Sequence, residues 1–560
     1  MKYRNRILSP AKPRYPLSGK LPALTVALLL SGSIPAHAGG RYESFLRKAA
    51  GHEAYLNPVA ATFFGSESHE EFVDVGAMPD GSILAFGNAW GPEFPDQPTP
   101  HVIGQGTHRG LDPSGGGRMR EDIAEPDALP RHNPDVAGMF VRYNDDLTEI
   151  LSVTRFDWGL ASLESGRVTP EGKLVVTGRA TSAFRELAAS SPHFHEHDPA
   201  QGGNTGALTF EGERVPGDVF IAQLDPETWS MDWVWIFPGY RNPPELHVDH
   251  EGNYVFSARG WWRLGAEGRP LSEIERTGGS NRLLGVSPKD GSLLAGGHNN
   301  PGTGREPWWR PYLHGFSPDG EFLWEVYGWD GGVVGHDDFR LVSDSYVRNG
   351  GFDAEGNIIV IGSSDGGNSV YQRSPIDLWR GHGGSEGYGM SVWGMQVGQA
   401  TYIVRMEPEN FDVEVSSRWL SYVPNNFEAA GARNRPNTIG ISKFRALEAG
   451  GMIFTGRSAT GLIETPNALY RYPGDGSRFG GHYVAAFNRD FTELRYSSFK
   501  PGVRIESLEK TPRGFSAVGA AFASRNNEGE IPTPLLHPVQ PRFGGGYKDA
   551  WIMLLEGPQD

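Results

Sequence analysis

GSILAFG at residues 81–87 is the first of seven similar segments in this 560-residue chain. The other six are GKLVVTG (172–178), GNYVFSA (252–258), GSLLAGG (291–297), GNIIVIG (356–362), GGMIFTG (450–456) and RGFSAVG (513–519). Each copy places a glycine turn before about five strand-forming residues, and most copies end in another glycine. Because a recurring unit of this kind buries its apolar face only against its neighbours, the segments predict a repeat architecture.

Short aromatic and β-branched runs alternate with these segments. They occupy residues 138–143, 218–224, 401–406, 482–487 and 549–554, and partner runs follow at 150–155 and 494–499. One unit is then strand, turn, strand, loop, strand, glycine turn and strand. Seven such units predict an all-β, seven-bladed β-propeller of four-stranded antiparallel blades. The fourth unit is the hardest to phase, with 261–264 as its expected opening strand.

The ends of the repeat array predict how the ring closes. The first unit, at 63–87, lacks an opening strand, and the last strand, at 549–554, has no glycine-turn segment after it. We therefore expect the C-terminal strand to join the first blade and remove the exposed sheet edges. The propeller should occupy 61–557, after a lead-in at 39–60 that is partly helical around 42–50.

Residues 1–38 have the pattern of a signal peptide. Six basic residues accompany an apolar run at 21–30, and Ala36-His37-Ala38 supplies the small residues that a signal peptidase accepts. The apolar run is too short to span a bilayer comfortably, and no later stretch is long enough. We expect a secreted or periplasmic monomer whose mature chain has no transmembrane span.

Charge and composition exclude several classes of function. The formal charge of −16 becomes −22 when the six basic residues of the leader are removed. Since phosphate neutralisation needs a basic face, nucleic acid is not an expected partner. The chain has no cysteine, which excludes disulfides, thiolate catalysis and thiolate metal sites.

Several short sequences resemble the seven-bladed propeller repeat family abbreviated SBBP, whose repeats read D-A-F-V-x-x-L and D-x-x-G-N-x-Y-V-x-G-x-T around a Y-S-x-x-x-G-G turn. The matching sequences are DGSI (80–83), EFP (93–95), TGRS (455–458), TPNA (465–468), YSSF (496–499) and GGYKDA (545–550). The resemblance covers nearly all of the mature chain and implies the propeller fold. It implies no activity, because that repeat class has no shared catalytic residues.

Long insertions separate some of the repeats, whose first residues lie 39 to 94 residues apart. A bare blade needs about 40 residues, so the surplus lies in insertions between blades, at about 90–137, 183–217, 365–400 and 523–548. Loops longer than about 15 residues are uncommon in compact domains unless they are functional or disordered. We expect them to gather on one face of the ring and to carry the binding residues.

The insertion at 365–400 combines aromatic, arginine and histidine side chains in a glycine-rich frame. Tyrosine and histidine exchange protons, arginine neutralises carboxylates, and tryptophan stacks on sugar rings. This composition predicts an anionic-sugar site, with loop packing as the alternative role of the aromatic residues. The candidates are Tyr371, Arg373, Trp379, Arg380, His382, Tyr388 and Trp393.

Two histidine-containing segments offer further candidates. His336, followed by two aspartates and Arg340, is expected near the same face, either as a base or beside carboxylates that bind Ca²⁺. The segment at 193–198 reads HFHEHD. In an extended chain its imidazoles, those of His193, His195 and His197, share one side and suit a transition metal. The alternatives are a structural turn and a solvated loop, so the cofactor stays unknown.

Two functions from different classes remain open. The first is a propeller that binds an extracellular glycan or a cell-surface protein through its loop face. The second is a polysaccharide lyase acting on uronic acids, since propeller lyases such as ulvan lyases resemble this chain in architecture, although none of their motifs aligns with it. The lyase hypothesis makes His336 or His382 the base and Tyr371 or Tyr388 the acid. It makes Arg373 or Arg380 the carboxylate partner. The candidate ligand-binding residues of the loop face are Arg340, Arg380, Trp379 and Trp393.

Overall fold

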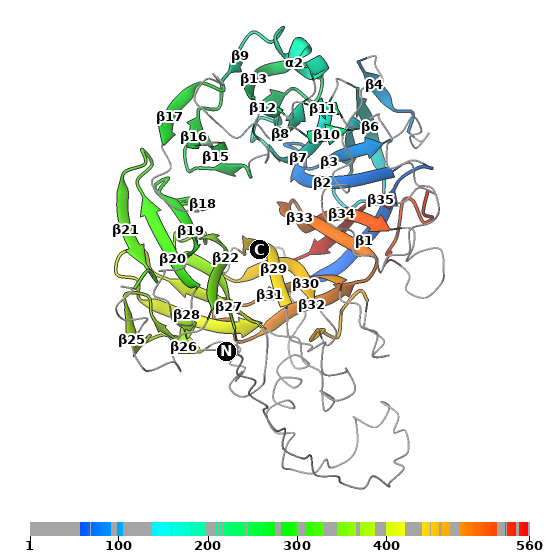
Figure 1. Cartoon of the computed structure of the whole chain (residues 1–560). Coiled ribbons are helices and arrows are strands. Elements are labelled where there is room, and N and C mark those ends of the chain that lie inside the picture. Colours follow the sequence, from blue (N-terminus) through cyan, green and yellow to red (C-terminus); the bar gives the residue numbers. More distant parts are fainter. Residues whose placement is uncertain are drawn as a thin grey trace, which may run out of the picture. The chain divides into compact units, whose positions relative to one another are not determined.

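The computed structural model describes residues 56–67, 69–90, 98–104, 136–157, 160–180, 182–197, 208–210, 213–215, 218–238, 240, 245–258, 260–274, 282–299, 309–329, 344–365, 370–386, 399–419, 439–447, 450–458, 462–470, 481–522, 533, 535–544 and 548–557. Contacts divide the chain into two compact units, Met1–Phe45 and Leu46–Asp560. The second unit contains seven antiparallel sheets arranged as a ring (Figure 1), which confirms the seven-bladed propeller. No helix in the described ranges is long and apolar enough to cross a membrane.

The first four blades follow one another along the chain, and in each the strands run in sequence order from the innermost to the outermost. Blade 1 contains β2 (His69–Ala77), β3 (Ile83–Trp90), β5 (Val136–Tyr143) and β6 (Ile150–Phe156). Blade 2 contains β7 (Leu160–Val168), β8 (Leu174–Ala180), β12 (Asp218–Leu224) and β13 (Met231–Phe237). Blade 3 contains β14 (His247–Val248), β15 (Tyr254–Ala258), β16 (Gly260–Leu264) and β17 (Pro270–Ile274). Blade 4 contains β18 (Arg282–Val286), β19 (Leu293–Asn299), β20 (Arg310–Phe316) and β21 (Phe322–Val326).

The remaining three blades complete the ring. Blade 5 contains β22 (Ser345–Phe352), β23 (Ile358–Asp365), β27 (Gln399–Met406) and β28 (Val413–Trp419). Blade 6 contains β29 (Ile439–Ala446), β30 (Met452–Ser458), β31 (Gly481–Phe487) and β32 (Leu494–Lys500). Blade 7 contains β33 (Val503–Thr511), β34 (Gly514–Phe522), β35 (Lys548–Glu556) and, as its outermost strand, β1 (Asn57–Phe64).

Smaller elements lie within the insertions. A fifth strand pairs in parallel with the outermost strand of blades 1, 2 and 5: β4 (His101–Ile103), β9 (Phe194–Glu196) and β26 (Ser385–Glu386). The others are α2 (Ser182–Ala188), the hairpin of β10 (Leu208–Phe210) and β11 (Glu213–Val215), η4 (Val370–Gln372), and the hairpin of β24 (Arg373–Ser374) and β25 (Asp377–Gly381).

Both glycines of the repeated segment have a structural reason. The opening glycine lies in the turn from the innermost strand to the second strand, with φ between 74° and 88° in six blades and 153° in the seventh, backbone that favours glycine. These glycines are Gly81, Gly172, Gly252, Gly291, Gly356, Gly450 and Gly514. The closing glycine packs against the innermost strand. A Cβ at Gly456 would lie 1.8 Å from a backbone oxygen of that strand, and one at Gly178 would lie 2.1 Å away.

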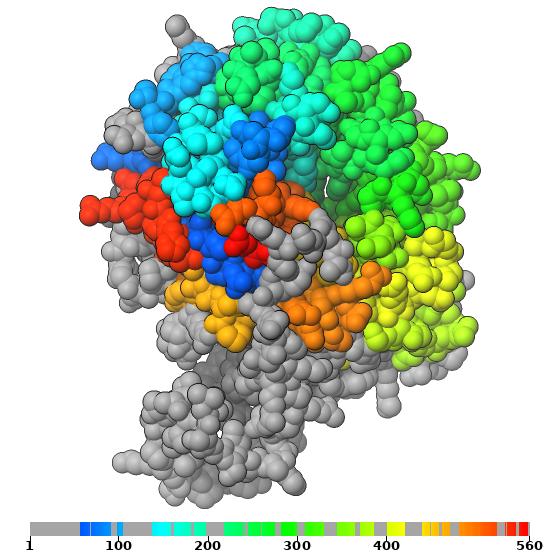
Figure 2. All heavy atoms as spheres, turned by 180° about the vertical axis from the view of Figure 1, so that it is seen from behind, coloured from blue at the N-terminus to red at the C-terminus, as the bar shows by residue number. Residues whose placement is uncertain are grey.

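Pairing of the two terminal strands closes the ring, as expected, and the segments lie side by side in both views (Figures 1 and 2). The blade that they share differs from the prediction. β35 already pairs with β34 of its own sheet, so β1 adds to the last blade and the C-terminal strand does not join the first. The reason is that each glycine-turn hairpin forms a sheet with the hairpin that follows it, not with the one before.

Part of the insertion at 523–548 holds β1 in place. Backbone groups of Ala61 and Leu536 exchange two hydrogen bonds, of 2.7 and 3.0 Å. The Gln540 amide accepts a hydrogen bond from the Gly65 N–H and donates one to the Gly65 carbonyl oxygen, both at 3.1 Å. In its described part, 535–544, this insertion therefore covers the outer edge of the closing strand, which an uncovered sheet would leave exposed.

The four long insertions all join the second strand of a blade to its third, so they lie within sheets rather than between blades. Because neighbouring strands are antiparallel, this junction lies at the end of the ring opposite the glycine turns. We call it the insertion end, and the opposite end the turn end. The described residues that flank the four insertions therefore lie at the same end of the ring.

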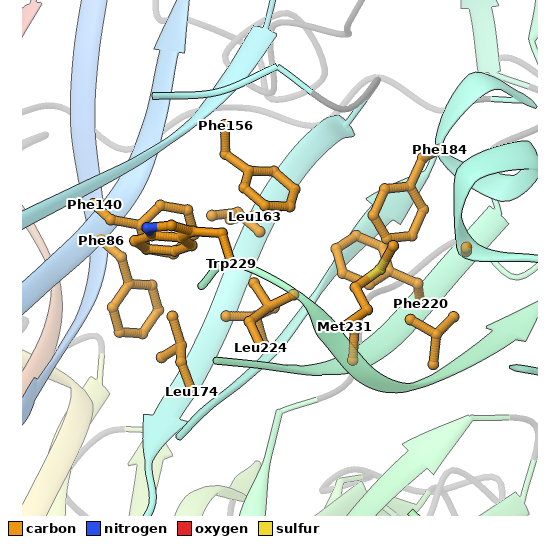
Figure 3. Packing of buried hydrophobic residues seen from close by; sticks show 14 of the residues in the cluster. Phe86, Phe140, Phe156, Leu163, Leu174, Phe184, Phe220, Leu224, Trp229 and Met231 are labelled. Carbon is orange, nitrogen blue, oxygen red and sulfur yellow. The ribbon is translucent and has the colours of Figure 1, made fainter. Parts of the chain in front are cut away.

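Hydrophobic residues in the turns between third and fourth strands contribute to the packing between blades. Four of these residues have positive φ values of 50° to 60°: Leu147, Trp229, Phe411 and Phe491. Trp229 of blade 2 reaches blade 1, where its ring lies 4.6 Å from Phe140 and 6.1 Å from Phe156 (Figure 3). A left-handed backbone conformation costs about 1–2 kcal/mol for a non-glycine residue. Burial of a large apolar side chain stabilises the fold by about the same amount or more, so the two effects offset each other.

Candidate functional site at the seam between blades 4 and 5

Tyr371 anchors the insertion of blade 5 to the ring. It is fully buried in η4, and its hydroxyl donates a 2.5 Å hydrogen bond to the carbonyl oxygen of Tyr346. Its ring lies 5.1 Å from that of Tyr402 in the same blade and 5.7 Å from that of Tyr327, which follows β21 of blade 4. Burial raises the pKa of Tyr371 well above its usual value, and it also raises the pKa of Tyr327. Tyr371 therefore has the environment of a structural residue.

Gly362, the closing glycine of the blade 5 repeat, makes room for this ring. A Cβ at this position would lie 2.2 Å from the Tyr371 ring. We predict that Gly362→Ala lowers the free energy of unfolding by about 1–3 kcal/mol through overpacking, measured by denaturant titration. Gly440→Ala is the matched control, because a Cβ there meets nothing within 4 Å. Equal unfolding midpoints for the two variants would contradict the prediction.

Trp309 lies across the seam between blades 4 and 5, next to the first strand of blade 5. Its backbone N–H donates to Asp344 Oδ1 at 3.1 Å, and its carbonyl oxygen accepts from the Ser345 N–H at 2.7 Å. The His298 ring lies 5.1 Å from the Trp309 ring and 4.8 Å from that of Tyr346. With its backbone fixed in this way, Trp309 still has 39% of its surface exposed.

His298 is a neutral aromatic partner in this cluster. Burial lowers its pKa, and the positive charge of Arg348 lowers it further. Arg348 itself lies over the Tyr346 ring at 4.0 Å and donates from Nε to Ser363 Oγ at 2.9 Å. The seam thus combines aromatic rings packed edge to face with arginine side chains at the insertion end.

A continuous set of contacts connects Trp309 to the hairpin at 373–381. Arg310 donates from Nη1 to the carbonyl oxygen of Trp329, and from Nε to Asn299 Oδ1 at 2.8 Å. The Trp329 ring lies 5.5 Å from the Tyr327 ring, edge to face. The Tyr327 N–H then donates to the carbonyl oxygen of Pro375 at 2.8 Å. Residues from three separate stretches of chain therefore form one surface.

The hairpin brings four sequence candidates together. Arg373 pairs with Gly381 across it, and the His382 N–H donates to the carbonyl oxygen of Gln372 at 3.2 Å. The Trp379 N–H donates to Asp377 Oδ1 at 3.0 Å. Trp379 is 47% exposed and Arg380 is exposed beside it.

Four other candidates lie outside the described residues: His336, Arg340, Tyr388 and Trp393. The segment that carries His336 and Arg340 follows Trp329 and precedes Asp344. Both of these flanking residues contact the Trp309–Arg310 pair. The chain therefore leaves and re-enters the described structure at the seam.

The three candidate metal ligands of blade 2 lie elsewhere. His195 in β9 stacks on Trp235 at 4.6 Å, and His197 packs edge to face against Trp262 of blade 3 at 5.3 Å. Burial lowers the pKa of His195, with a smaller contribution from His193. Within the described ranges, no group of three His, Asp or Glu side chains is arranged to hold a metal ion. The rings of His195 and His197 therefore pack against aromatic side chains.

Charged side chains on or next to the innermost strands pair with one another near the axis of the ring. Lys443 of blade 6 places Nζ 2.7 Å from Oε1 of Glu245, which precedes β14 of blade 3. Glu509 of blade 7 accepts from Arg167 of blade 2 and from Arg445 of blade 6. Burial opposes ionisation of Glu245, but Lys443, His247 and Arg282 together outweigh it and keep the pKa of that carboxyl low. Since these charges satisfy each other, we place the candidate site at the seam rather than near the axis.

Comparisons with known proteins add no functional assignment. No protein-family model and no curated protein matches the chain. Among solved structures it is similar to a protein of unknown function from Dyadobacter fermentans DSM 18053 and to the WD40 β-propeller domain of Doa1. Identities are 9% and 10%, coverage is 90% and 83% of this chain and 99% and 94% of the other chains, and the TM-score is 0.36 for both. These scores are too low to bear on function, and the fold assignment rests on the sheet topology.

Proposed function

We propose that this chain is an exported β-propeller that binds an extracellular glycan or cell-surface component at its insertion end. The observation that carries the proposal is the exposure of Trp309 and Trp379 at one seam. All other tryptophans in the described ranges are buried or half-buried. Exposed indole rings held by an ordered backbone are typical of binding surfaces, because their apolar area gains from contact with a ligand. The pattern of residues 1–38 supports export.

We also propose that the repeats are of the SBBP type. Support comes from the recurrence of the glycine-turn hairpin as the inner half of all seven blades. That assignment concerns the fold only, and the ligand is inferred from the residues at the seam.

The absence of cysteine from the sequence allows a direct test of the binding face. A glycan array first identifies a ligand for the unmodified protein. Ile376→Cys, at a position 63% exposed at the seam, and Asp319→Cys, in an exposed turn of blade 4 at the turn end, then each receive a bulky maleimide adduct. We expect the adduct at residue 376 to abolish ligand binding and the adduct at residue 319 to leave it unchanged.

Both variants change one exposed side chain, so thermal unfolding should show equal stability before binding is compared. Undiminished binding by both adducts would place the ligand site away from the seam and overturn the proposal. Loss of binding by the Asp319→Cys adduct alone would move the site to the turn end.

The lyase hypothesis is a second proposal, favoured by the neighbouring positions of Arg373 and His382 across the base of one hairpin. A cation beside a base is what removal of a proton next to a carboxylate requires. The buried, hydrogen-bonded Tyr371 is a poor proton donor, so Tyr388 is the acid in this proposal. Ultraviolet absorbance of an unsaturated product from uronic-acid polymers tests it. No product with the unmodified protein would reject it.

A further inference from the structure

We infer that the seam takes a carboxylated sugar, with Trp309 and Trp379 stacking on sugar rings and Arg380 binding the carboxylate. This inference rests on the proposed function and narrows its ligand to one chemical class. It starts from a repeated local pattern, since each of the two exposed tryptophans is followed directly by an arginine, Arg310 or Arg380.

The two indole rings belong to one ordered surface. Trp309 is held at both backbone groups by residues at the start of blade 5, and the Trp379 N–H is held by Asp377. The contacts through Trp329 and Tyr327 join the two positions across the seam. Exposed indole rings on a fixed backbone suit the apolar faces of sugar rings, because little backbone freedom is lost on binding.

The two arginines differ in what they already bind. Arg310 donates from Nε to Asn299 and from Nη1 to the carbonyl oxygen of Trp329, so its side chain holds the Trp309–Arg310 segment in place. Arg380 is exposed and makes no ion pair or side-chain hydrogen bond with any residue that the structure describes. A guanidinium binds a carboxylate through two parallel hydrogen bonds. Arg380 is therefore the group available to an external anion.

Other features favour a sugar over a protein partner. Among the described residues, the strongly exposed large apolar side chains at the seam are three, namely Trp309, Ile376 and Trp379. Two of them are indole rings, which stack well on the apolar faces of sugars. The chain is also strongly acidic, with a net charge of −16, so attraction of an anion has to come from a local arginine and not from the overall field.

The test compares a uronic-acid oligosaccharide with its carboxyl-reduced, neutral counterpart by titration calorimetry on the full mature chain. We expect the acidic sugar to bind about tenfold or more tightly than the neutral one. Trp379→Ala should weaken binding of both sugars about tenfold. Arg380→Gln should remove the preference for the acidic sugar while leaving the neutral one unaffected. Arg269→Gln, at an exposed arginine of the turn end, is the matched control.

Equal affinity for the two sugars, or an unchanged preference in Arg380→Gln, would overturn the inference while the proposed function stands. The same holds if neither sugar binds but an adduct at residue 376 blocks binding of another ligand, such as a protein. If the adduct blocks nothing, the proposed function fails as well. Since Trp379 and Arg380 are exposed, both variants should keep the stability of the unmodified protein, which thermal unfolding verifies.

Discussion

Replacing Phe63 and Phe64 together by alanine is expected to lower the free energy of unfolding by about 6–10 kcal/mol. The two rings lie on opposite sides of β1 and are almost completely buried. Phe63 packs against Phe543 at 5.7 Å, and Phe64 against Phe72 at 6.1 Å, so they belong to different interfaces of blade 7. Because they lie in separate hydrophobic clusters, their costs should largely add. Their total is comparable with the stability of a typical domain, about 5–15 kcal/mol.

Denaturant unfolding and small-angle scattering of the double variant would measure this effect, the second by the larger dimensions of an opened ring. Leu323→Ala is the control, because Leu323 is 51% exposed on the outer strand of blade 4 and its removal should change stability by about 0.5 kcal/mol or less. If the double variant unfolds at the same midpoint as this control, closure by β1 does not stabilise the ring.

The closure should also weaken as the pH rises from about 4 to about 8, because two buried carboxyls lie beside it. Burial raises the pKa of Glu70 to about 8, with a further contribution from Asp549, while hydrogen bonds from Ser66 oppose the change. Burial raises the pKa of Asp549 to about 7 against a hydrogen bond from the Gly544 N–H. In this range the folded protein holds protons that the unfolded chain has released, so stability falls with pH until these carboxyls ionise. The contribution is on the order of 4 kcal/mol for each group.

The variant Glu70→Gln/Asp549→Asn isolates this effect, since amides keep the shape and carry no charge. Its unfolding free energy should exceed that of the unmodified protein above about pH 8 and change less with pH. The neighbouring Lys548–Glu71 ion pair, at 2.7 Å, is unchanged in both proteins. Burial lowers the pKa of Lys500 to about 7, so this residue makes the unfolding free energy rise with pH above that value. Its contribution is the same in both proteins and cancels when their unfolding free energies are subtracted. A difference that does not vary with pH would refute the assignment, and Asp319→Asn is the control for an exposed carboxyl.

The sequence was sufficient for the blade count, because the opening glycine recurs wherever the innermost strand turns back with positive φ. It was insufficient for the blade boundaries. Along the chain, the hairpin of a blade's third and fourth strands lies between two glycine-turn hairpins. Only the hydrogen bonds show which of those two belongs to the same sheet. The crossing from blade 6 to blade 7 is short, since Lys500 is followed almost directly by Val503, whereas the four longest insertions lie within sheets. Length therefore suggested the wrong partner.

The candidate site was predictable only where its residues are close together in the sequence. Trp379, Arg380, Arg373 and His382 lie together in one insertion, so composition alone grouped them. Their aromatic neighbours were not grouped, since Tyr327 of blade 4 contacts Tyr371 of blade 5 only when the two blades pack side by side. The tryptophan pair at 308–309 was the sequence feature that could have indicated the blade 4 part of the surface. The pair Trp261–Trp262 has the same sequence pattern but is buried, so the pattern does not identify an exposed tryptophan. Burial of a tryptophan is decided by its neighbours in space.

The placement of β1 as the outer strand of blade 7 bears on how the chain acquires its structure. During synthesis the first strand of the ring is made earliest, yet the strand that pairs with it is made last. Until β35 is complete, the segment from Asn57 to Phe64 has no strand to pair with. Pairing of β1 with β35 therefore has to close a loop that contains all the other blades, which makes it an entropically costly step. A nascent chain shortened near its C-terminus would leave both blade 7 and the earliest strand unmatched, and would be the species most prone to aggregation or proteolysis.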